Sequence, residues 1–205
     1  MDKCCVTPTD KVLDKEFWDI QWRKNETGWD MGQVSPPLKE YIDQLNNKNL
    51  KILIPGCGNT YEAEYLLANG FTNVTVIDIS PALADMLKEK FSAELGKRIH
   101  VICGDFFELT DHFDLILEQT FFCALNPSLR IRYVSKMYEL LNTGGRLVGL
   151  LFNRIFDFEG PPFGGTQQEY EMLFSPYFKL HTFEQARNSF HKRAATELFI
   201  NFIKA

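Results

Sequence analysis

The sequence predicts a doubly wound α/β fold, with a mostly parallel seven-stranded sheet, a C-terminal antiparallel hairpin and an N-terminal helical cap. From residue 50 onward, short apolar or β-branched runs alternate with segments of helical spacing. Strands that alternate with helices form parallel sheets through right-handed crossovers. The last two strand-like runs, 177–183 and 196–203, have no helical segment between them, so we expect them to pair antiparallel.

Capping signals locate several boundaries of the predicted elements. Gly70 follows apolar residues at helical spacing and is expected to end a helix over 60–69. Ser80 and Pro81 suit the N-cap and first position of the next helix, which extends to about Phe91. The other predicted helices cover 38–45, 127–141 and 167–174, and the other predicted strands cover 50–54, 74–77, 99–103, 113–117 and, after a turn at 142–145, 146–152.

Length and charge limit the classes of partner. The 205 residues fit one domain, in which 1–45 form the cap segment and 46–205 the doubly wound core. A net charge of -5 and the lack of a long Lys/Arg run argue against a nucleic-acid partner, and Lys192-Arg193 is interpreted as a solvated turn. The longest apolar stretch, 147–152, is far shorter than the roughly 20 residues that span a bilayer.

The cysteines favour an intracellular protein. Their number is odd, and neither a Cys-x-x-Cys motif nor a Cys/His ligand spacing occurs, so reduced thiols are expected rather than disulfides or a metal site. Residues 1–17 lack the apolar run of a signal peptide. We therefore expect a cytoplasmic monomer that acts on a small molecule. The five cysteines are Cys4, Cys5, Cys57, Cys103 and Cys123.

A Gly-x-Gly motif, Gly56 and Gly58, follows the first regular strand. Glycine lets the backbone turn sharply and lets a ligand approach the main chain. A dinucleotide fingerprint would place a third glycine where the chain has Tyr61, which disfavours a nicotinamide cofactor. S-adenosylmethionine carries no pyrophosphate and does not need that glycine. An ordinary strand-to-helix turn explains the two glycines equally well.

Acidic residues follow the next two strands. Asp78 lies 20 residues after Gly58, where a carboxylate can accept hydrogen bonds from ribose hydroxyls, although it would also suit a helix cap. Asp105 can accept a hydrogen bond from the adenine amino group and Phe106 offers a face for the ring; a loop acid and a core aromatic are the alternatives. These positions are the carboxyl ends of adjacent strands, where open α/β sheets bind ligands. Together they predict an S-adenosylmethionine site.

Three tryptophans lie in the cap segment. Trp18 and Trp22 are four residues apart and share one helical face, and Trp29 follows. The sulfonium of S-adenosylmethionine is a cation, and aromatic faces attract cations. A cap anchored in the core by its tryptophans is the alternative.

These residues resemble the thiopurine S-methyltransferase family. Within that family, the segments 120–125 (Thr-Phe-Phe-Cys-Ala-Leu) and 160–163 (Gly-Pro-Pro-Phe) are similar to the branch of plant halide and thiol methyltransferases. The other matching segments are Trp18 to Pro37 with Trp29-Asp30-Met31-Gly32, Ile54 to Gly58, Asp78-Ile79-Ser80, Gly104 to Phe107 and Phe113 to Ile116.

The resemblance implies an S-adenosylmethionine-dependent methyltransferase that acts on a soft nucleophile: a halide, hydrosulfide, thiocyanate, thiopurine or small thiol. Halide-type relatives tend to carry tyrosine where this chain has Gln119, which leaves the acceptor open. The implied cofactor contacts are Trp18, Trp22, Trp29, Gly56, Asp78, Asp105, Phe106 and Gln119, and we add Gly58 from the glycine motif.

No catalytic dyad is expected for such a reaction. The methyl group leaves a neutral thioether and joins an anionic nucleophile, so positioning and desolvation suffice. A small-molecule N- or O-methyltransferase would need a base, for which Glu118 is the candidate, and a non-catalytic cofactor-binding protein is a further alternative. Candidate acceptor walls, for which core packing is an equal alternative, are Gln119, Phe121, Phe122, Pro161, Pro162 and Phe163.

Overall fold

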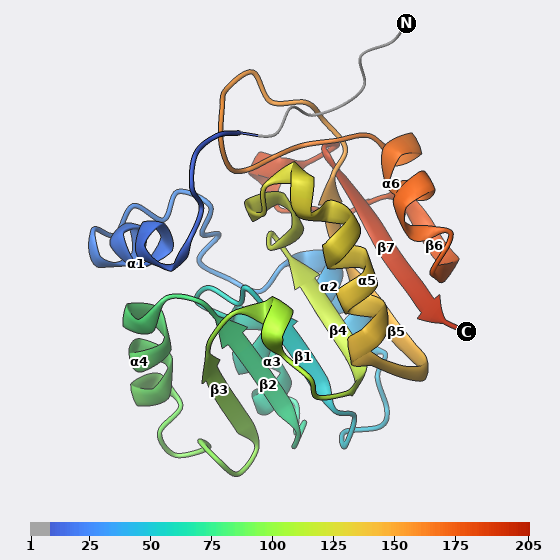
Figure 1. The fold of residues 1–205 in the computed structure, drawn as a ribbon. Helices are drawn as coiled ribbons and strands as arrows, with labels where there is room; N and C mark the ends of the chain where they lie inside the picture. The colour runs from blue at the N-terminus through green and yellow to red at the C-terminus, as the bar shows by residue number, and fades with distance from the viewer. Residues whose placement is uncertain (1–8) are drawn as a thin grey trace, which may run out of the picture.

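A seven-stranded sheet forms the centre of the molecule, whose residues 9–205 are described by a computed structural model (Figure 1). Strands β1 to β5 are parallel, and β7 lies antiparallel between β5 and β6, in the order β3-β2-β1-β4-β5-β7-β6. The predicted fold class, including its C-terminal hairpin, is confirmed. The strands are β1 (Ile52–Pro55), β2 (Val74–Asp78), β3 (Ile99–Cys103), β4 (Phe113–Gln119), β5 (Leu141–Phe152), β6 (Phe178–Gln185) and β7 (Glu197–Lys204).

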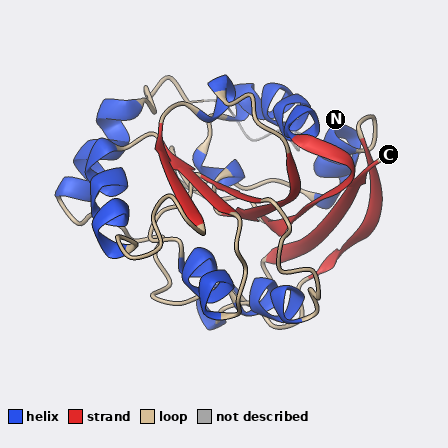
Figure 2. Cartoon of the chain, turned by 90° about the horizontal axis from the view of Figure 1, so that it is seen from below, coloured by secondary structure: helices blue, strands red, loops and turns tan. Residues whose placement is uncertain are grey.

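Helices lie on both sides of the sheet (Figure 2). Among residues 9–205, no helix is both long enough and apolar enough to cross a bilayer. The α-helices are α1 (Lys15–Arg23), α2 (Pro36–Asp43), α3 (Tyr61–Ala68), α4 (Pro81–Lys90), α5 (Arg130–Leu140) and α6 (Gln167–Phe174). Short 3-10 helices are η1 (Phe106–Glu108), η2 (Phe122–Ala124), η3 (Pro127–Leu129) and η4 (His191–Arg193).

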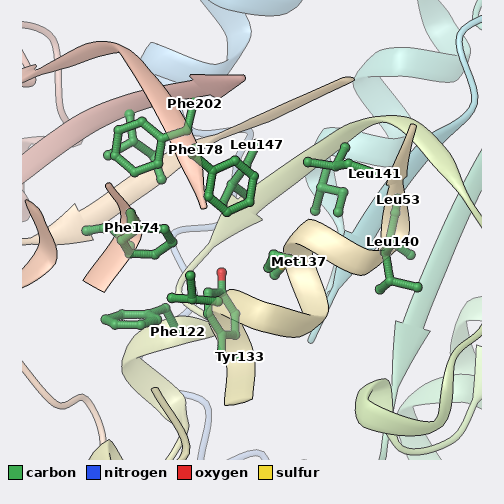
Figure 3. Packing of buried hydrophobic residues seen from close by; sticks show 14 of the residues in the cluster. Leu53, Phe122, Tyr133, Met137, Leu140, Leu141, Leu147, Phe174, Phe178 and Phe202 are labelled. Carbon is green, nitrogen blue, oxygen red and sulfur yellow. The ribbon is translucent and has the colours of Figure 1, made fainter. Parts of the chain in front are cut away.

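Alternating side chains divide the core into two layers. Ile52 and Ile54 of β1 pack in the layer formed with α2, α3 and α4, whereas Leu53 between them packs in the layer formed with α5 and α6. The second layer is rich in aromatic rings, among them Phe174 and Phe202, whose centroids are 5.1 Å apart (Figure 3). Two buried layers hold the sheet rigid, so the loops at its carboxyl edge have fixed starting points.

Two predicted boundaries were wrong because local backbone bonding differs. Strand β5 begins at Leu141, which pairs with Phe113 ahead of a register shift, so the predicted turn at 142–145 is an irregularity within the strand. The predicted helix at 127–141 is split because the Asn126 side chain caps η3, and α5 begins only at Arg130.

The cap segment docks onto the start of α4. Helix α1 lies beside α4 (Figure 1), and the Asp19 carboxylate accepts hydrogen bonds from the Ser80 hydroxyl (2.9 Å) and the Ala82 N–H (2.8 Å). These bonds satisfy polar groups at the N-terminus of α4, where a negative charge is favourable. The Ala82 N–H, followed by Arg23, lowers the pKa of Asp19 to about 2.

We expect Asp19→Ala to lower the free energy of unfolding by about 1–2 kcal/mol at pH 7, the usual cost of losing a helix cap. Because folding depresses the pKa of Asp19, its contribution is complete above pH 4 and is lost as the pH falls towards 2. Urea denaturation of the wild type and the variant at pH 7 and at pH 2 measures this contribution. Glu16→Gln, an exposed change on the same helix, should have little effect; an equal loss at low pH would refute the charge-based contribution.

Candidate active site

A cavity of about 540 Å³ opens at the carboxyl edge of the sheet, beneath the cap segment. It draws its walls from the loops that follow β1, β2, β3 and β4, as expected for a ligand site of an open α/β sheet. Twelve of the residues expected at a site line it: Trp18, Trp22, Trp29, Gly56, Gly58, Asp78, Asp105, Phe106, Gln119, Phe121, Pro161 and Pro162.

The backbone conformation favours glycine at both positions of the motif, and space requires it at Gly56. Gly56 and Gly58 have φ of +53° and +51°, in the left-handed region that favours glycine. A Cβ on Gly56 would overlap the ring of Phe121, which follows β4. The glycine loop after β1 therefore leaves room for the Phe121 ring on one side, and the backbone of this loop is open to the cavity.

Asp78 is bonded to neighbouring backbone groups and also lines the cavity. Its carboxylate accepts hydrogen bonds from the Ser80 N–H (3.0 Å) and the Gly58 N–H (3.4 Å), so it joins the glycine loop to the start of α4. Burial raises the pKa of Asp78, partly opposed by these backbone donors. The side chain also lines the cavity, where its remaining lone pairs can accept hydroxyl donors.

Asp105 and Phe106 also combine local and cavity roles. The Asp105 carboxylate accepts a hydrogen bond from the Phe107 N–H (2.9 Å) and caps η1, while its side chain stays exposed at the cavity. Phe106 is buried and stands edge-on to Phe121, with centroids 5.1 Å apart. A carboxylate and an aromatic ring thus lie next to one another at the end of β3.

The tryptophans form one cluster. Trp18 and Trp22 each meet Trp29 edge to face, with centroids 5.6 and 5.9 Å apart. The neighbouring Asp30 accepts hydrogen bonds from the Asn59 amide, which lies in the glycine loop, and from the hydroxyl of Tyr61, which follows the loop (3.2 Å). Tyr61, the residue in place of a third glycine, therefore holds the cap over the cavity.

Three expected residues point elsewhere. Phe122 and Phe163 are not among the residues that line the cavity; both are buried, and Phe122 packs on Tyr133 and Tyr170 in the core. Glu118 is fully buried below the cavity, and its carboxyl oxygens accept hydrogen bonds from the Phe121 and Phe122 N–H groups and the Tyr133 hydroxyl. Burial raises the pKa of Glu118 to about 7. Its bonds shape the loop after β4 instead of facing an acceptor.

A sequence model of the family described as thiopurine S-methyltransferase matches residues 13–202. The chain belongs to the thiopurine S-methyltransferase family. It is therefore an S-adenosylmethionine-dependent methyltransferase.

Curated relatives of this methyltransferase come from plants and bacteria. Probable thiol methyltransferase 2 of Arabidopsis thaliana is 33% identical, over 78% of this chain and 71% of its own. Thiocyanate methyltransferase 1 of Brassica oleracea is 29% identical over 91% and 84%. Thiopurine S-methyltransferase of Vibrio vulnificus is 29% identical over 91% and 93%.

Solved structures share the fold of this methyltransferase at lower identity. The Burkholderia thailandensis 1,6-didemethyltoxoflavin-N1-methyltransferase, with bound 1,6-didemethyltoxoflavin and S-adenosylhomocysteine, has a TM-score of 0.73 at 18% identity and covers 97% of this chain and 94% of its own. A TehB-like methyltransferase from Corynebacterium glutamicum has a TM-score of 0.65 at 20% identity, over 93% and 98%.

Buried polar atoms in the cavity fit the cofactor of this methyltransferase. Among residues 9–205, the Thr60 hydroxyl and both amide atoms of Gln119 are buried without a hydrogen-bond partner, and both residues line the cavity. Thr60 and Thr120 also have φ of +49° and +61°, which is strained for β-branched residues and is typical of functional sites. Thr60, in the loop after β1, and Gln119, at the end of β4, lie near the middle of the sheet and suit the amino-acid end of S-adenosylmethionine. Asp78 and Asp105 suit its adenosine end.

The interpretation of Lys192-Arg193 as a solvated turn was wrong for Arg193. Its side chain is only 11% exposed, lines the cavity and donates a hydrogen bond from Nη2 to the Trp29 carbonyl oxygen (2.7 Å). Lys192 is exposed as expected. No local pattern indicates this burial, because Trp29 lies at the other end of the chain.

We expect Asp78→Ala to weaken binding of S-adenosylhomocysteine by about 1–3 kcal/mol, because ribose hydroxyls would lose their acceptor. Calorimetry measures the affinity, and thermal unfolding of the same variant measures stability. Asp85→Ala, an exposed change on α4, is the control. A fall in stability with unchanged affinity would show that Asp78 serves only as a cap.

Proposed function

We propose that this methyltransferase transfers the methyl group of S-adenosylmethionine to a small soft nucleophile, above all a thiol, with hydrosulfide, thiocyanate, thiopurines and halides as related acceptors. The cofactor supplies an electrophilic methyl group on a sulfonium. Support for a sulfur acceptor comes from relatives named as thiol, thiocyanate and thiopurine methyltransferases.

The observation that carries this proposal is the division of the cavity. Four of its five acidic residues lie away from the ends of β4 and β5: Asp78 ends β2, Asp105 follows β3, and Asp30 and Glu62 are hydrogen-bonded to the glycine loop and the cap. The part beside β4 and β5 is mostly apolar. Its walls include Phe121, Leu125, Phe152, Pro161 and Pro162.

Such walls suit a nucleophile that arrives already ionised. The aromatic groups exclude water from an anion, which raises its reactivity, and the tryptophan faces attract the cationic centre it attacks. Holding the two reactants in line then accounts for the catalysis, with no proton to transfer. An amine or alcohol would need a base, and Glu118 does not reach the cavity.

One acid remains for the rival N- or O-methyltransferase. Glu159 is exposed, lines the cavity and lies two residues before Pro161. Glu159, and not Glu118, is therefore the candidate base for a nucleophile that must lose a proton.

An acceptor screen with labelled S-adenosylmethionine tests the proposal. We expect transfer to thiophenols, hydrosulfide, thiocyanate or iodide to exceed transfer to matched anilines and phenols. For thiols the rate should rise with pH in step with ionisation of the free thiol, whereas for iodide it should stay nearly flat. Faster methylation of an amine or alcohol than of any thiol or halide would refute the proposal.

Glu159→Gln separates the two mechanisms directly. For a thiol acceptor we expect kcat within about threefold of the wild-type value, because no group needs deprotonation by the protein. A base contributes about 100-fold or more, so a loss of that size would make Glu159 catalytic. Asp157→Asn, in the same loop but outside the cavity lining, is the matched control.

We also propose that the enzyme is a cytoplasmic monomer acting without nucleic acid or membrane, within the single domain expected above. Free thiols at Cys57, Cys103 and Cys123 support a reducing compartment, while Cys4 and Cys5 lie outside the described residues. The monomeric state is the part of this proposal that can be measured directly. Sedimentation at micromolar concentration tests it.

A further inference from the structure

The helical turn η4 places one guanidinium in the cavity wall. Arg193 ends η4, just before β7, whose first residue Glu197 pairs with Phe152 at the end of β5. The guanidinium carbon lies 5.4 Å from the centre of the Phe152 ring. Arg193 therefore belongs to the β5 side of the cavity, together with the apolar walls.

The donors of this guanidinium are only partly used. Among residues 9–205, Nη2 donates to the Trp29 carbonyl (2.7 Å) and Nη1 to Glu197 Oε1 (3.4 Å), which leaves three of the five N–H groups without an acceptor. The Glu197 contact is long, since charge-assisted bonds are about 2.7–2.9 Å. Burial raises the pKa of Glu197, and the Ser189 hydroxyl and the Arg193 guanidinium oppose that shift. Three N–H groups of Arg193 are therefore available to a further acceptor.

Arg193 lies apart from the expected cofactor contacts at the strand ends and meets only the backbone of Trp29 among the expected contacts of the cap. Adenosine contacts are proposed after β2 and β3, and amino-acid contacts at Thr60 and Gln119, after β1 and β4. Arg193 enters from the β5–β7 edge, and neighbouring strands are about 4.8 Å apart. A group bound there belongs to the acceptor and lies away from the atom that receives the methyl group.

We infer that Arg193 binds an anionic group, of the carboxylate class, that the methyl acceptor carries in addition to its sulfur. The planar guanidinium matches the two oxygens of a carboxylate, and its partial burial strengthens the bond. The Trp29 carbonyl and the Phe152 ring hold the guanidinium in place. In a chain of net charge -5, such a cation favours thiols that carry a carboxylate over thiols that do not. This inference rests on the proposed thiol acceptor.

Binding to the preformed complex with S-adenosylhomocysteine tests Arg193 without turnover. Calorimetry compares 4-mercaptobenzoate with 4-methylbenzenethiol, in which a methyl group replaces the carboxylate. Arg193→Gln should weaken binding of the carboxylate at least about tenfold and that of the neutral thiol less than about threefold. Arg193→Lys should recover part of the preference, and Lys192→Gln, an exposed change in the same turn, should alter neither.

Each outcome decides a separate point. Equal losses for both thiols, or no loss for the carboxylate, would overturn the inference. A tenfold loss in affinity for S-adenosylhomocysteine itself would instead assign Arg193 to the carboxylate of the cofactor and also overturn it. If Arg193→Gln does not fold, the comparison of Arg193→Lys with wild type carries the test. Carboxylate-dependent binding together with methylation of an amine or alcohol faster than of any thiol or halide would refute the proposed function and leave the anion site intact.

Discussion

The buried carboxyl group of Glu118 organises the active-site edge of the sheet. Its oxygens accept hydrogen bonds from the Phe121 and Phe122 N–H groups and from the Tyr133 hydroxyl, and so fix the loop after β4. Burying such a group is tolerable only with these partners in place. The opposite residue on β5, Gly149, is required because a Cβ there would overlap Glu118.

The shape of that loop determines both the cavity and the core beneath it. Phe121 turns towards Gly56 and forms a wall, while the next residue, Phe122, turns into the aromatic layer shown in Figure 3. Thr120, with φ of +61°, makes the reversal between strand and loop. The strain of this backbone is tolerated because three hydrogen bonds to one buried carboxyl group hold the loop. The surrounding active-site loop therefore depends on a residue that does not line the cavity.

The sequence pattern located the candidate site residues that lie at the ends of parallel strands. Gly56, Asp78 and Asp105 could be located because parallel strands bring their carboxyl ends to one edge. The pattern could not distinguish Phe121 from Phe122, because in a 3-10 turn adjacent side chains diverge in directions that depend on Glu118. Strand and helix alternation found the elements, but not the boundary at Leu141, which depends on pairing with Phe113.

The cap explains why other site residues escaped sequence reasoning. Three contacts join it to distant parts of the chain: Asp19 to the start of α4, Asp30 to the glycine loop and the Trp29 carbonyl to Arg193. Each contact pairs residues that are remote in sequence, so no local periodicity reports it. A lysine-arginine pair is usually solvated, and here the Trp29 carbonyl, the Glu197 carboxyl group and the Phe152 ring make burial of Arg193 favourable.

The charges around the cavity give the two ends of the cavity different selectivities. Among the described residues that line it, five are acidic and only Lys11 and Arg193 are cationic basic residues; Lys11 is exposed, with its ammonium 4.9 Å from the centre of the Phe17 ring. Carboxylates favour the sulfonium cofactor and disfavour an anion. For an acceptor that carries a carboxylate in addition to its sulfur, the partly buried Arg193 guanidinium is the positive charge in the cavity wall that offsets this repulsion. The same charge contributes little to a neutral thiol, which must gain its affinity from the aromatic walls alone.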